Sequence, residues 1–286
     1  MKISILSQHR CQLGEGPLWD PRAQCLYWID SLGPTLYRYD EQTQKARYWE
    51  LPGQSIGSLA VRDQGGLILA MDQSIYCFDP GDGSLVHAVK LLDEQSGIRL
   101  NDGKVDRSGS FLTGSMNLDP EGNVDCSLYR VGSGFLVEAL LDGFQCFNGP
   151  CFSIAGDRIY LTGRLEGLIE SGDYHPETGL SNLRELYGYC NPDGATVDAD
   201  GFIWSAQWAD QSVIRISPDG KLDRCIEVPG YIVSSVAFGG ANLDKIFLTT
   251  VAAELYGDRS EAKDAGATLV ITGSGYHGLP EPFFNG

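Results

Sequence analysis

The stretch Asp198-Ala-Asp-Gly-Phe-Ile-Trp204 (DADGFIW) contains the pattern on which the fold depends. A turn built from Asp and Gly leads directly into a short apolar run, Gly201–Trp204, whose β-branched and aromatic residues are typical of a strand. Five similar runs follow turns elsewhere in the chain. The second residues of the six runs stand at positions 26, 67, 111, 159, 202 and 246, so the runs are 41, 44, 48, 43 and 44 residues apart. The other five runs are Cys25–Ile29, Gly66–Ala70, Ser110–Thr113, Arg158–Leu161 and Lys245–Leu248.

Each run is followed, roughly ten residues later, by a second run with strand character. Most of the second runs end in turn residues such as Asp79-Pro-Gly-Asp-Gly83, and strands bounded by such turns favour antiparallel hairpins. The second runs are Thr35–Tyr39, Ser74–Phe78, Ser127–Val131, Gly167–Glu170, Ser212–Ile216 and Ala267–Ile271.

A repeat of this length with about four strands is typical of a β-propeller blade. We therefore predict an all-β fold, a six-bladed β-propeller with four antiparallel strands per blade, as a single domain over residues 1–286. A strand near Ile3–Ser7 is expected to complete the last blade, because closing the ring removes open sheet edges. A β-sandwich is the competing all-β fold, but it does not predict the observed repeat. No stretch has a convincing helical period with caps.

The composition narrows the possible functions. The net charge is 21 − 38 = −17, which opposes binding to nucleic acid or to anionic membranes. No run of about 18 apolar residues is present, and the apolar part of the N-terminal segment is too short for a signal peptide, so we expect a cytoplasmic protein. The eight cysteines contain no CxxC pair and are expected to be reduced, a redox link between Cys146 and Cys151 being the less favoured alternative.

Four oxygen-bearing side chains share one position in the repeat. Glu15, Asn101, Asn148 and Asp193 lie nine to eleven residues before the second residue of the apolar run in their own blade, and each is followed by Gly or by Asp-Gly. We expect each to lie just ahead of the innermost strand, which in the third blade would be Lys104–Asp106. Because innermost propeller strands run beside the central channel, these side chains should meet at one of its mouths.

The other two blades have small residues at this position, within Ile56-Gly57-Ser58 and Val233-Ser234-Ser235. An arc of carboxylate and amide oxygens beside small residues predicts a hard-cation site next to an open pocket. Oxygen ligands suit Ca²⁺, Mg²⁺ or Mn²⁺, and less obviously Zn²⁺. None of the four histidines falls at these positions, so a histidine-rich zinc site is not indicated. The alternative is that these Asn-Gly and Asp-Gly pairs are only turns where strands begin.

Two further residues are candidates for substrate contact. Arg99 precedes Asn101 by two residues, so in an extended chain the two side chains point to the same side. Beside a cation and an open channel, we expect Arg99 to hydrogen-bond a hydroxyl or carbonyl oxygen of a substrate. Asp119, at the end of the GSMNLD stretch, is a candidate for the same mouth, with a solvated loop aspartate as the alternative.

Five stretches, spread over almost the whole chain, give the sequence a resemblance to the SMP-30/gluconolactonase/luciferin-regenerating-enzyme family, which includes regucalcin and bacterial aldonolactonases. Each motif alone is unspecific, but together and in this order they are specific. The stretches are LGEGPLWD (13–20), RLNDGKVDRSGSFLTGSM (99–116), FNGPCFS (147–153), NPDGATVDADGFIWSAQW (191–208) and VAFGGANLDKIFLTT (236–250).

The resemblance implies a six-bladed propeller with one divalent metal ion in its channel, with Ca²⁺ favoured and Zn²⁺, Mg²⁺ or Mn²⁺ as alternatives. The metal ligands of the family pattern correspond to Glu15, Asn148 and Asp193, and Asp193 also matches the general base. The substrate-contacting arginine and asparagine of the family match Arg99 and Asn101.

Two positions depart from the family pattern. Asp119 matches an acidic substrate contact for which animal members have glutamate, so its reach is shorter. After the first apolar run of the fourth blade, relatives place an acid-bearing segment, whereas this chain has Leu161-Thr-Gly-Arg164. We expect the Thr162-Gly163 pair to alter the choice of substrate.

The reaction that the resemblance implies is metal-assisted hydrolysis of a small sugar lactone to the aldonic acid. The cation would polarise the ring carbonyl, and a water molecule that Asp193 activates, or that is already bound to the metal, would attack the carbonyl carbon. One alternative is hydrolysis of an organophosphate or another ester on the same propeller. The other is a non-catalytic propeller that binds a divalent cation, although the small residues of blades two and six leave room that a simple metal trap does not need.

Overall fold

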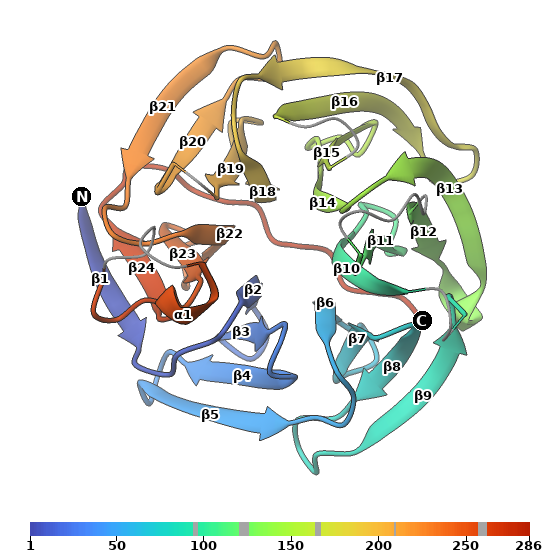
Figure 1. Ribbon diagram of the computed structural model, residues 1–286, viewed down its shortest axis with the longest axis horizontal. Coiled ribbons are helices and arrows are strands. Elements are labelled where there is room, and N and C mark those ends of the chain that lie inside the picture. Colours follow the sequence, from blue (N-terminus) through green and yellow to red (C-terminus); the bar gives the residue numbers. More distant parts are fainter. Residues whose placement is uncertain (94–96, 120–125, 164–166, 209, 257–261) are drawn as a thin grey trace.

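Six antiparallel sheets stand in a ring in the computed structural model of this chain, which describes residues 1–93, 97–119, 126–163, 167–208, 210–256 and 262–286 (Figure 1). Each sheet has four strands. The predicted six-bladed β-propeller is therefore confirmed. In the described part of the chain, helical turns are limited to α1 (Ala253–Tyr256) and the 3₁₀ turn η1 (Ser133–Phe135).

The strands of blades one to five follow one another from the centre of the ring to its rim (Figure 1). They are β2 (Gly14–Asp20), β3 (Cys25–Asp30), β4 (Thr35–Asp40) and β5 (Lys45–Glu50); β6 (Ile56–Val61), β7 (Leu67–Met71), β8 (Ser74–Phe78) and β9 (Leu85–Lys90); β10 (Ile98–Val105), β11 (Phe111–Asn117), β12 (Cys126–Val131) and β13 (Val137–Phe144); β14 (Asn148–Phe152), β15 (Arg158–Thr162), β16 (Leu168–His175) and β17 (Gly179–Gly188); β18 (Pro192–Val197), β19 (Ile203–Gln207), β20 (Ser212–Ile216) and β21 (Leu222–Glu227).

Blade six joins the two ends of the chain. Its inner strands are β22 (Val233–Gly239), β23 (Lys245–Thr250) and β24 (Thr268–Thr272), and its outermost strand is β1 (Lys2–Ser7). β1 pairs antiparallel with β24, so the N-terminal strand completes the last blade as predicted. Backbone hydrogen bonds between the first and last strands therefore close the ring.

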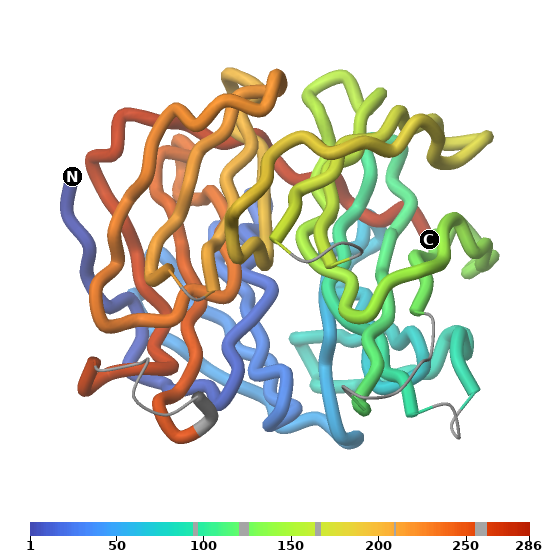
Figure 2. Tube along the Cα trace, turned by 45° about the horizontal axis from the view of Figure 1, so that its top comes forward, coloured from blue at the N-terminus to red at the C-terminus, as the bar shows by residue number. Residues whose placement is uncertain are grey.

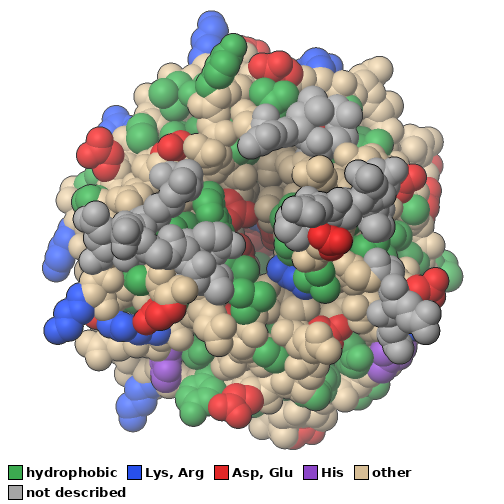
Figure 3. All heavy atoms as spheres, in the orientation of Figure 1, with side chains coloured by type: hydrophobic (Ala, Val, Ile, Leu, Met, Phe, Trp, Pro, Cys, Tyr) green, Lys and Arg blue, Asp and Glu red, His purple; other side chains and the backbone are tan. Residues whose placement is uncertain are grey.

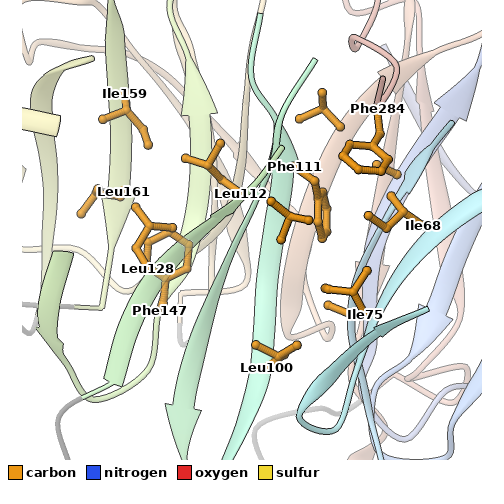
Figure 4. Packing of buried hydrophobic residues seen from close by; sticks show 14 of the residues in the cluster. Ile68, Ile75, Leu100, Phe111, Leu112, Leu128, Phe147, Ile159, Leu161 and Phe284 are labelled. Atoms are coloured by element: carbon orange, nitrogen blue, oxygen red, sulfur yellow. The ribbon is translucent and has the colours of Figure 1, made fainter. Parts of the chain in front are cut away.

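Apolar side chains fill the wedges between neighbouring blades. The largest buried cluster joins blades two, three and four, and Figure 4 shows Phe111, Leu128 and Phe147 within it. Phe284, near the C-terminus, is fully buried in the same cluster. Because such interiors are packed as densely as organic crystals, the blades hold the inner strands at fixed positions around the centre.

Every innermost strand is interrupted by a register irregularity at the same point. In β10 it falls between Leu100 and Gly103, so Asn101 lies within an eight-residue strand and not ahead of Lys104–Asp106. The sequence-based boundary was wrong because β-bulges and turns draw on the same residues. Both use Asn, Asp or Gly where the backbone leaves the regular extended conformation, and Gly149 in β14 has a φ of +64°.

Residues 273–286, which we call the C-terminal strap, cross the centre of the ring as an extended segment (Figures 1 and 2). In blade five the N–H of Ala199 donates to the carbonyl oxygen of His277 (2.9 Å), and in blade two the N–H of Phe284 donates to the carbonyl oxygen of Val61 (2.8 Å). The strap narrows the channel at the end where the innermost strands finish. No motif in the sequence predicts this closure.

All eight cysteines are free thiols, so the alternative of a Cys146–Cys151 link receives no support. The helices of the described residues include none with the length and apolar character needed to span a bilayer.

Candidate active site

A pocket of about 220 Å³ opens at the centre of the ring, where the innermost strands begin. Figure 3 shows a hollow at the centre of this face, with acidic and basic side chains at its floor. Five of the six residues proposed from the sequence line the pocket. The lining residues are Leu13, Glu15, Arg99, Asn101, Met116, Cys146, Asn148, Pro192, Asp193 and Trp208.

Three different blades deliver the predicted metal ligands, each at the bulge of its innermost strand. Glu15 is the second residue of β2, Asn148 is the first residue of β14, and Asp193 is the second residue of β18. The register shift begins at Glu15 in β2, at Asn148 in β14 and one residue before Asp193 in β18. A bulge bends the strand and re-aims a side chain, which brings these oxygens to the pocket from residues far apart in sequence.

Asn101 holds its neighbour in blade four. Its Nδ2 donates to Asn148 Oδ1 (2.9 Å) and to the carbonyl oxygen of Phe147 (2.8 Å). An amide nitrogen carries two hydrogens, so these bonds engage both of them and leave Asn101 Oδ1 as the atom that can accept a hydrogen bond in the pocket. Asn148 Oδ1 keeps a second lone pair for another partner.

The two carboxylates of the pocket are electrostatically unfavourable when ionised. Burial raises the pKa of Asp193 well above its ordinary value, and the nearby charge of Asp102 raises it further. Burial also raises the pKa of Glu15, as do the charges of Asp193 and Asp102, while Arg99 opposes the shift. Carboxylates placed in this way are stabilised in their ionised form by a bound cation.

The donor set fits a hard divalent cation. Glu15 and Asp193 offer carboxylate oxygens and Asn148 offers an amide oxygen, which are the ligand types that Ca²⁺ and Mg²⁺ take. Cys146 also lines the pocket, but burial raises the pKa of its thiol to about 12, so it is a neutral thiol at physiological pH. No cluster of three or more His, Cys, Asp or Glu side chains suited to a metal occurs among the residues described, so the candidate set depends on the amide of Asn148.

Arg99 and Asp119 have different surroundings. Arg99 is only 4% exposed, lines the pocket, and donates from its guanidinium to the carbonyl oxygen of Leu100 (2.9 Å). Asp119 is exposed, two residues beyond the end of β11, and its N–H donates to Asn117 Oδ1 (2.9 Å). The structure therefore brings Arg99 to the pocket wall and does not bring Asp119 there.

The family model described as the SMP-30/gluconolactonase/LRE-like region matches residues 13–252 of this chain, which include all six predicted site residues. The chain belongs to this family. Pentonolactonase XacC of Haloferax volcanii is 31% identical over 270 residues, which cover 93% of this chain and 90% of the relative. A 6-deoxy-6-sulfogluconolactonase of Pseudomonas putida is 30% identical over 283 residues, which cover 96% of this chain and 95% of the relative.

The solved structure of a calcium-binding protein, regucalcin, from Agrobacterium tumefaciens is similar over nearly its whole length. It superposes with a TM-score of 0.90 at 26% identity, covering 98% of this chain and 96% of that one. Membership of the SMP-30/gluconolactonase/LRE-like family thus agrees with the resemblance read from the motifs.

At the Thr162-Gly163 pair, which departs from the family pattern, the structure leaves no space for a side chain on Gly163. Gly163 has a φ of +92°, and a Cβ atom added there would lie 1.6 Å from the carbonyl oxygen of Cys146. Any larger side chain would require the backbone of this wall to move. Thr162 ends β15 and pairs with Asn148, whereas Arg164 lies outside the described residues.

Sequence reasoning missed part of the pocket wall of this family member. Leu13 and Cys146 lie two residues before Glu15 and Asn148, just as Arg99 lies two before Asn101, so the two-residue period of a strand predicts them equally well. Met116 lies in β11, the second strand of blade three, and Trp208 lies directly after β19, the second strand of blade five. Met116 pairs with Arg99 and Trp208 follows β19, placements that depend on strand register and not on a local motif.

Proposed function

We propose that this protein is a metal-dependent hydrolase that opens a sugar lactone to the corresponding aldonic acid. The observation that carries the proposal is the convergence of Glu15, Asn148 and Asp193 in one pocket with Arg99 and Asn101. Carboxylates destabilised by their surroundings suit a cation, and the arginine and amide suit a polyhydroxylated substrate. The pocket volume of about 220 Å³ favours a small substrate.

Glu15, Asn148 and Asp193 would hold the divalent ion. When bound, that ion supplies Lewis-acid stabilisation for negative charge developing on the carbonyl oxygen of the lactone. The all-oxygen donor set favours Ca²⁺, with Mg²⁺, Mn²⁺ and Zn²⁺ as alternatives. The relative whose structure has a TM-score of 0.90 is named a calcium-binding protein, which supports the same ion.

Asp193 is the residue to which we assign the general base. A carboxylate has two oxygens, so Asp193 can hold a cation with one and accept a proton from water with the other. The resulting hydroxide adds to the carbonyl carbon, the bond from that carbon to the ring oxygen breaks, and the ring oxygen takes the proton back from Asp193 to give the open-chain acid. A positioned base of this kind contributes on the order of 10²–10⁴ in rate.

Arg99 and Asn101 orient the substrate. The guanidinium of Arg99 donates hydrogen bonds to hydroxyl or carbonyl oxygens, while Asn101 Oδ1 accepts from a hydroxyl because its nitrogen is engaged with Asn148 and Phe147. Asp119 remains a proposed substrate contact. The names of two relatives, a pentonolactonase and a 6-deoxy-6-sulfogluconolactonase, support a sugar lactone as the substrate class.

The proposal is tested by measuring acid release from a panel of pentono- and hexonolactones, an organophosphate and a simple aryl ester. We expect turnover of at least one sugar lactone, loss of that activity after complete metal removal, and recovery on adding Ca²⁺ or another divalent ion. Activity that survives metal removal would exclude the metal-dependent mechanism. A preference for the organophosphate or aryl ester would select the alternative hydrolase, and metal binding without turnover would select a non-catalytic propeller.

A further inference from the structure

Asp102 lies one residue beyond Asn101 in β10, on the side of the bulge away from the pocket. It does not line the pocket but a second, narrower cavity of about 30 Å³ further along the channel, together with Lys104 and Glu281. Its carboxylate therefore has no direct access to a substrate in the pocket. Neither the family resemblance nor the proposed mechanism gives this residue a role.

Asn101 and Asp102 together enclose Asn148 from both sides. Asn101 Nδ2 donates to the carbonyl oxygen of Phe147 (2.8 Å), the residue before Asn148. Asp102 Oδ2 accepts from the N–H of Gly149 (2.8 Å), the residue after it. These two bonds run from blade three to blade four and fix the peptide groups on either side of Asn148, so they determine where its side chain points.

Gly149 also connects this segment to Asp193. Its backbone packs so closely against blade five that an added Cβ atom would lie 2.8 Å from the carbonyl oxygen of Asp193. A shift of the Gly149 peptide would therefore move the backbone of two proposed metal ligands at once. The hydrogen bond from Gly149 to Asp102 opposes such a shift.

Asp102 is itself held in place. Its Oδ1 accepts from the N–H of Gly103 (2.7 Å). Burial raises the pKa of Asp102, while the hydrogen bond from Gly149 and the positive charge of Lys104 oppose that shift. Lys104 Nζ donates to the carbonyl oxygen of Ala195 (2.9 Å) and to Glu281 Oε1 in the C-terminal strap (3.1 Å). The chain of contacts thus runs from the strap to Asp102 and from there to the residue beside Asn148.

We infer that Asp102 is a positioning residue, which orients the amide of Asn148 toward the cation by accepting the hydrogen bond from Gly149. This inference rests on the proposed metal site, but it makes its own claim. Affinity for the cation should depend on a side chain that never touches it, and should depend on the acceptor oxygen of that side chain.

The test measures Ca²⁺ and Mn²⁺ binding to the metal-stripped full-length protein by titration calorimetry, for wild type, Asp102→Ala and Asp102→Asn. Asp219→Asn, at an exposed turn, is the matched control. We expect Asp102→Ala to weaken binding by tenfold or more. Asp102→Asn can still accept from Gly149 with its one amide oxygen, but it loses the bond from Gly103 and the negative charge, so its affinity should lie between that of wild type and that of Asp102→Ala. The control should stay within about threefold of wild type. Circular dichroism and thermal melting establish that each variant is folded.

The outcomes separate this inference from the proposed function. If wild type binds no divalent cation, the metal site itself is refuted, and the inference with it. If wild type binds and Asp102→Ala binds equally well, or if folded Asp102→Asn is as weak as Asp102→Ala, the positioning role is refuted while the metal site stands. Should Asp102→Ala not fold, amide hydrogen exchange of wild type decides instead, because Gly149 must then exchange as slowly as a hydrogen-bonded strand amide.

Discussion

Glu15 and Asp193 are carboxylates in a position where their ionised forms are destabilised. Burial and the charges of neighbouring acids raise the pKa of both groups, while Arg99 and a hydrogen bond from the backbone of Gly16 oppose the shift at Glu15. Such an arrangement lowers the stability of the free protein and raises its affinity for a cation. Structural sites rarely need it, whereas binding sites often retain it at a cost in stability.

The substitution Asp193→Asn tests both the role of this carboxylate in turnover and its effect on the stability of the metal-free protein. We expect turnover of the lactone to fall by about 10²–10⁴, because the general base is lost. Because the pKa of Asp193 is raised in the folded state, ionisation of this group destabilises the fold as pH rises through the unfolded-state value. The metal-free variant should therefore melt at a higher temperature than metal-free wild type at pH 7. Near-normal turnover, or a lower melting temperature, would contradict the assignment.

The sequence was sufficient to predict five of the residues that line the pocket. Glu15, Asn101, Asn148 and Asp193 were found because a repeat converts a local motif into a position around a ring. Arg99 was found from the two-residue period of a strand, and the same rule was not extended to Leu13 and Cys146. Which atom of Asn101 faces the pocket depends on hydrogen bonds between blades, which the sequence does not specify.

The β-bulge is the element that creates the site. All six innermost strands carry one at equivalent positions, but only four of them present a carboxylate or an amide there. The strands themselves were predictable from apolar runs and turn residues. The bulge was not distinguished from a turn, because the difference lies in whether the flanking residues pair with the same neighbouring strand.

Replacing Gly149 by Ala tests the bulge of β14. The residue has a φ of +64° and would place its Cβ 2.8 Å from the carbonyl oxygen of Asp193, so we expect both strain and displacement of a proposed ligand. The free energy of unfolding should fall by about 2–3 kcal/mol, and cation affinity should fall by at least tenfold.

Gly134→Ala is the matched control for this substitution. Gly134 has a similar φ of +67°, but nothing lies within 4 Å of the added Cβ. It should lose about 1 kcal/mol from backbone strain alone and bind the cation as wild type does. Equal effects of the two substitutions on cation affinity would mean that the contact with Asp193 is unimportant.

Two long-range connections determine the shape of the whole molecule. β1 closes the ring by pairing with β24, and the C-terminal strap crosses the ring and joins blades five, two and three. The first was predicted because closing the ring removes open sheet edges. The second was not, because residues 273–286 have no periodic pattern and are ordered by contacts with residues far away in the sequence.

Glu281 is the charged anchor of the strap, and its contribution should depend on pH. Although burial favours the neutral form, Lys104 and Arg107, with hydrogen bonds from Lys104 and Thr196, hold the pKa of Glu281 below its ordinary value. A lowered pKa means that the stabilisation is present above the unfolded-state pKa and is lost as pH falls through the folded-state value.

We therefore expect Glu281→Gln to be less stable than wild type by about 1–3 kcal/mol at pH 7, with the difference shrinking as pH falls below about 4. Urea unfolding at a series of pH values measures this, and Glu227→Gln, at an exposed position in β21, is the control. A difference that is absent at pH 7, or that stays constant down to pH 3, would exclude an ionised Glu281 as the anchor.

Oxygens from blades one, four and five are expected to share one divalent cation, and diffraction from crystals grown with Mn²⁺ would locate that ion. The anomalous difference map should contain one strong peak in the pocket, within about 2.0–2.6 Å of a carboxylate oxygen of Glu15, a carboxylate oxygen of Asp193 and Oδ1 of Asn148. A fully loaded crystal with no peak there, or with its strongest peak bound by other residues, would contradict the account.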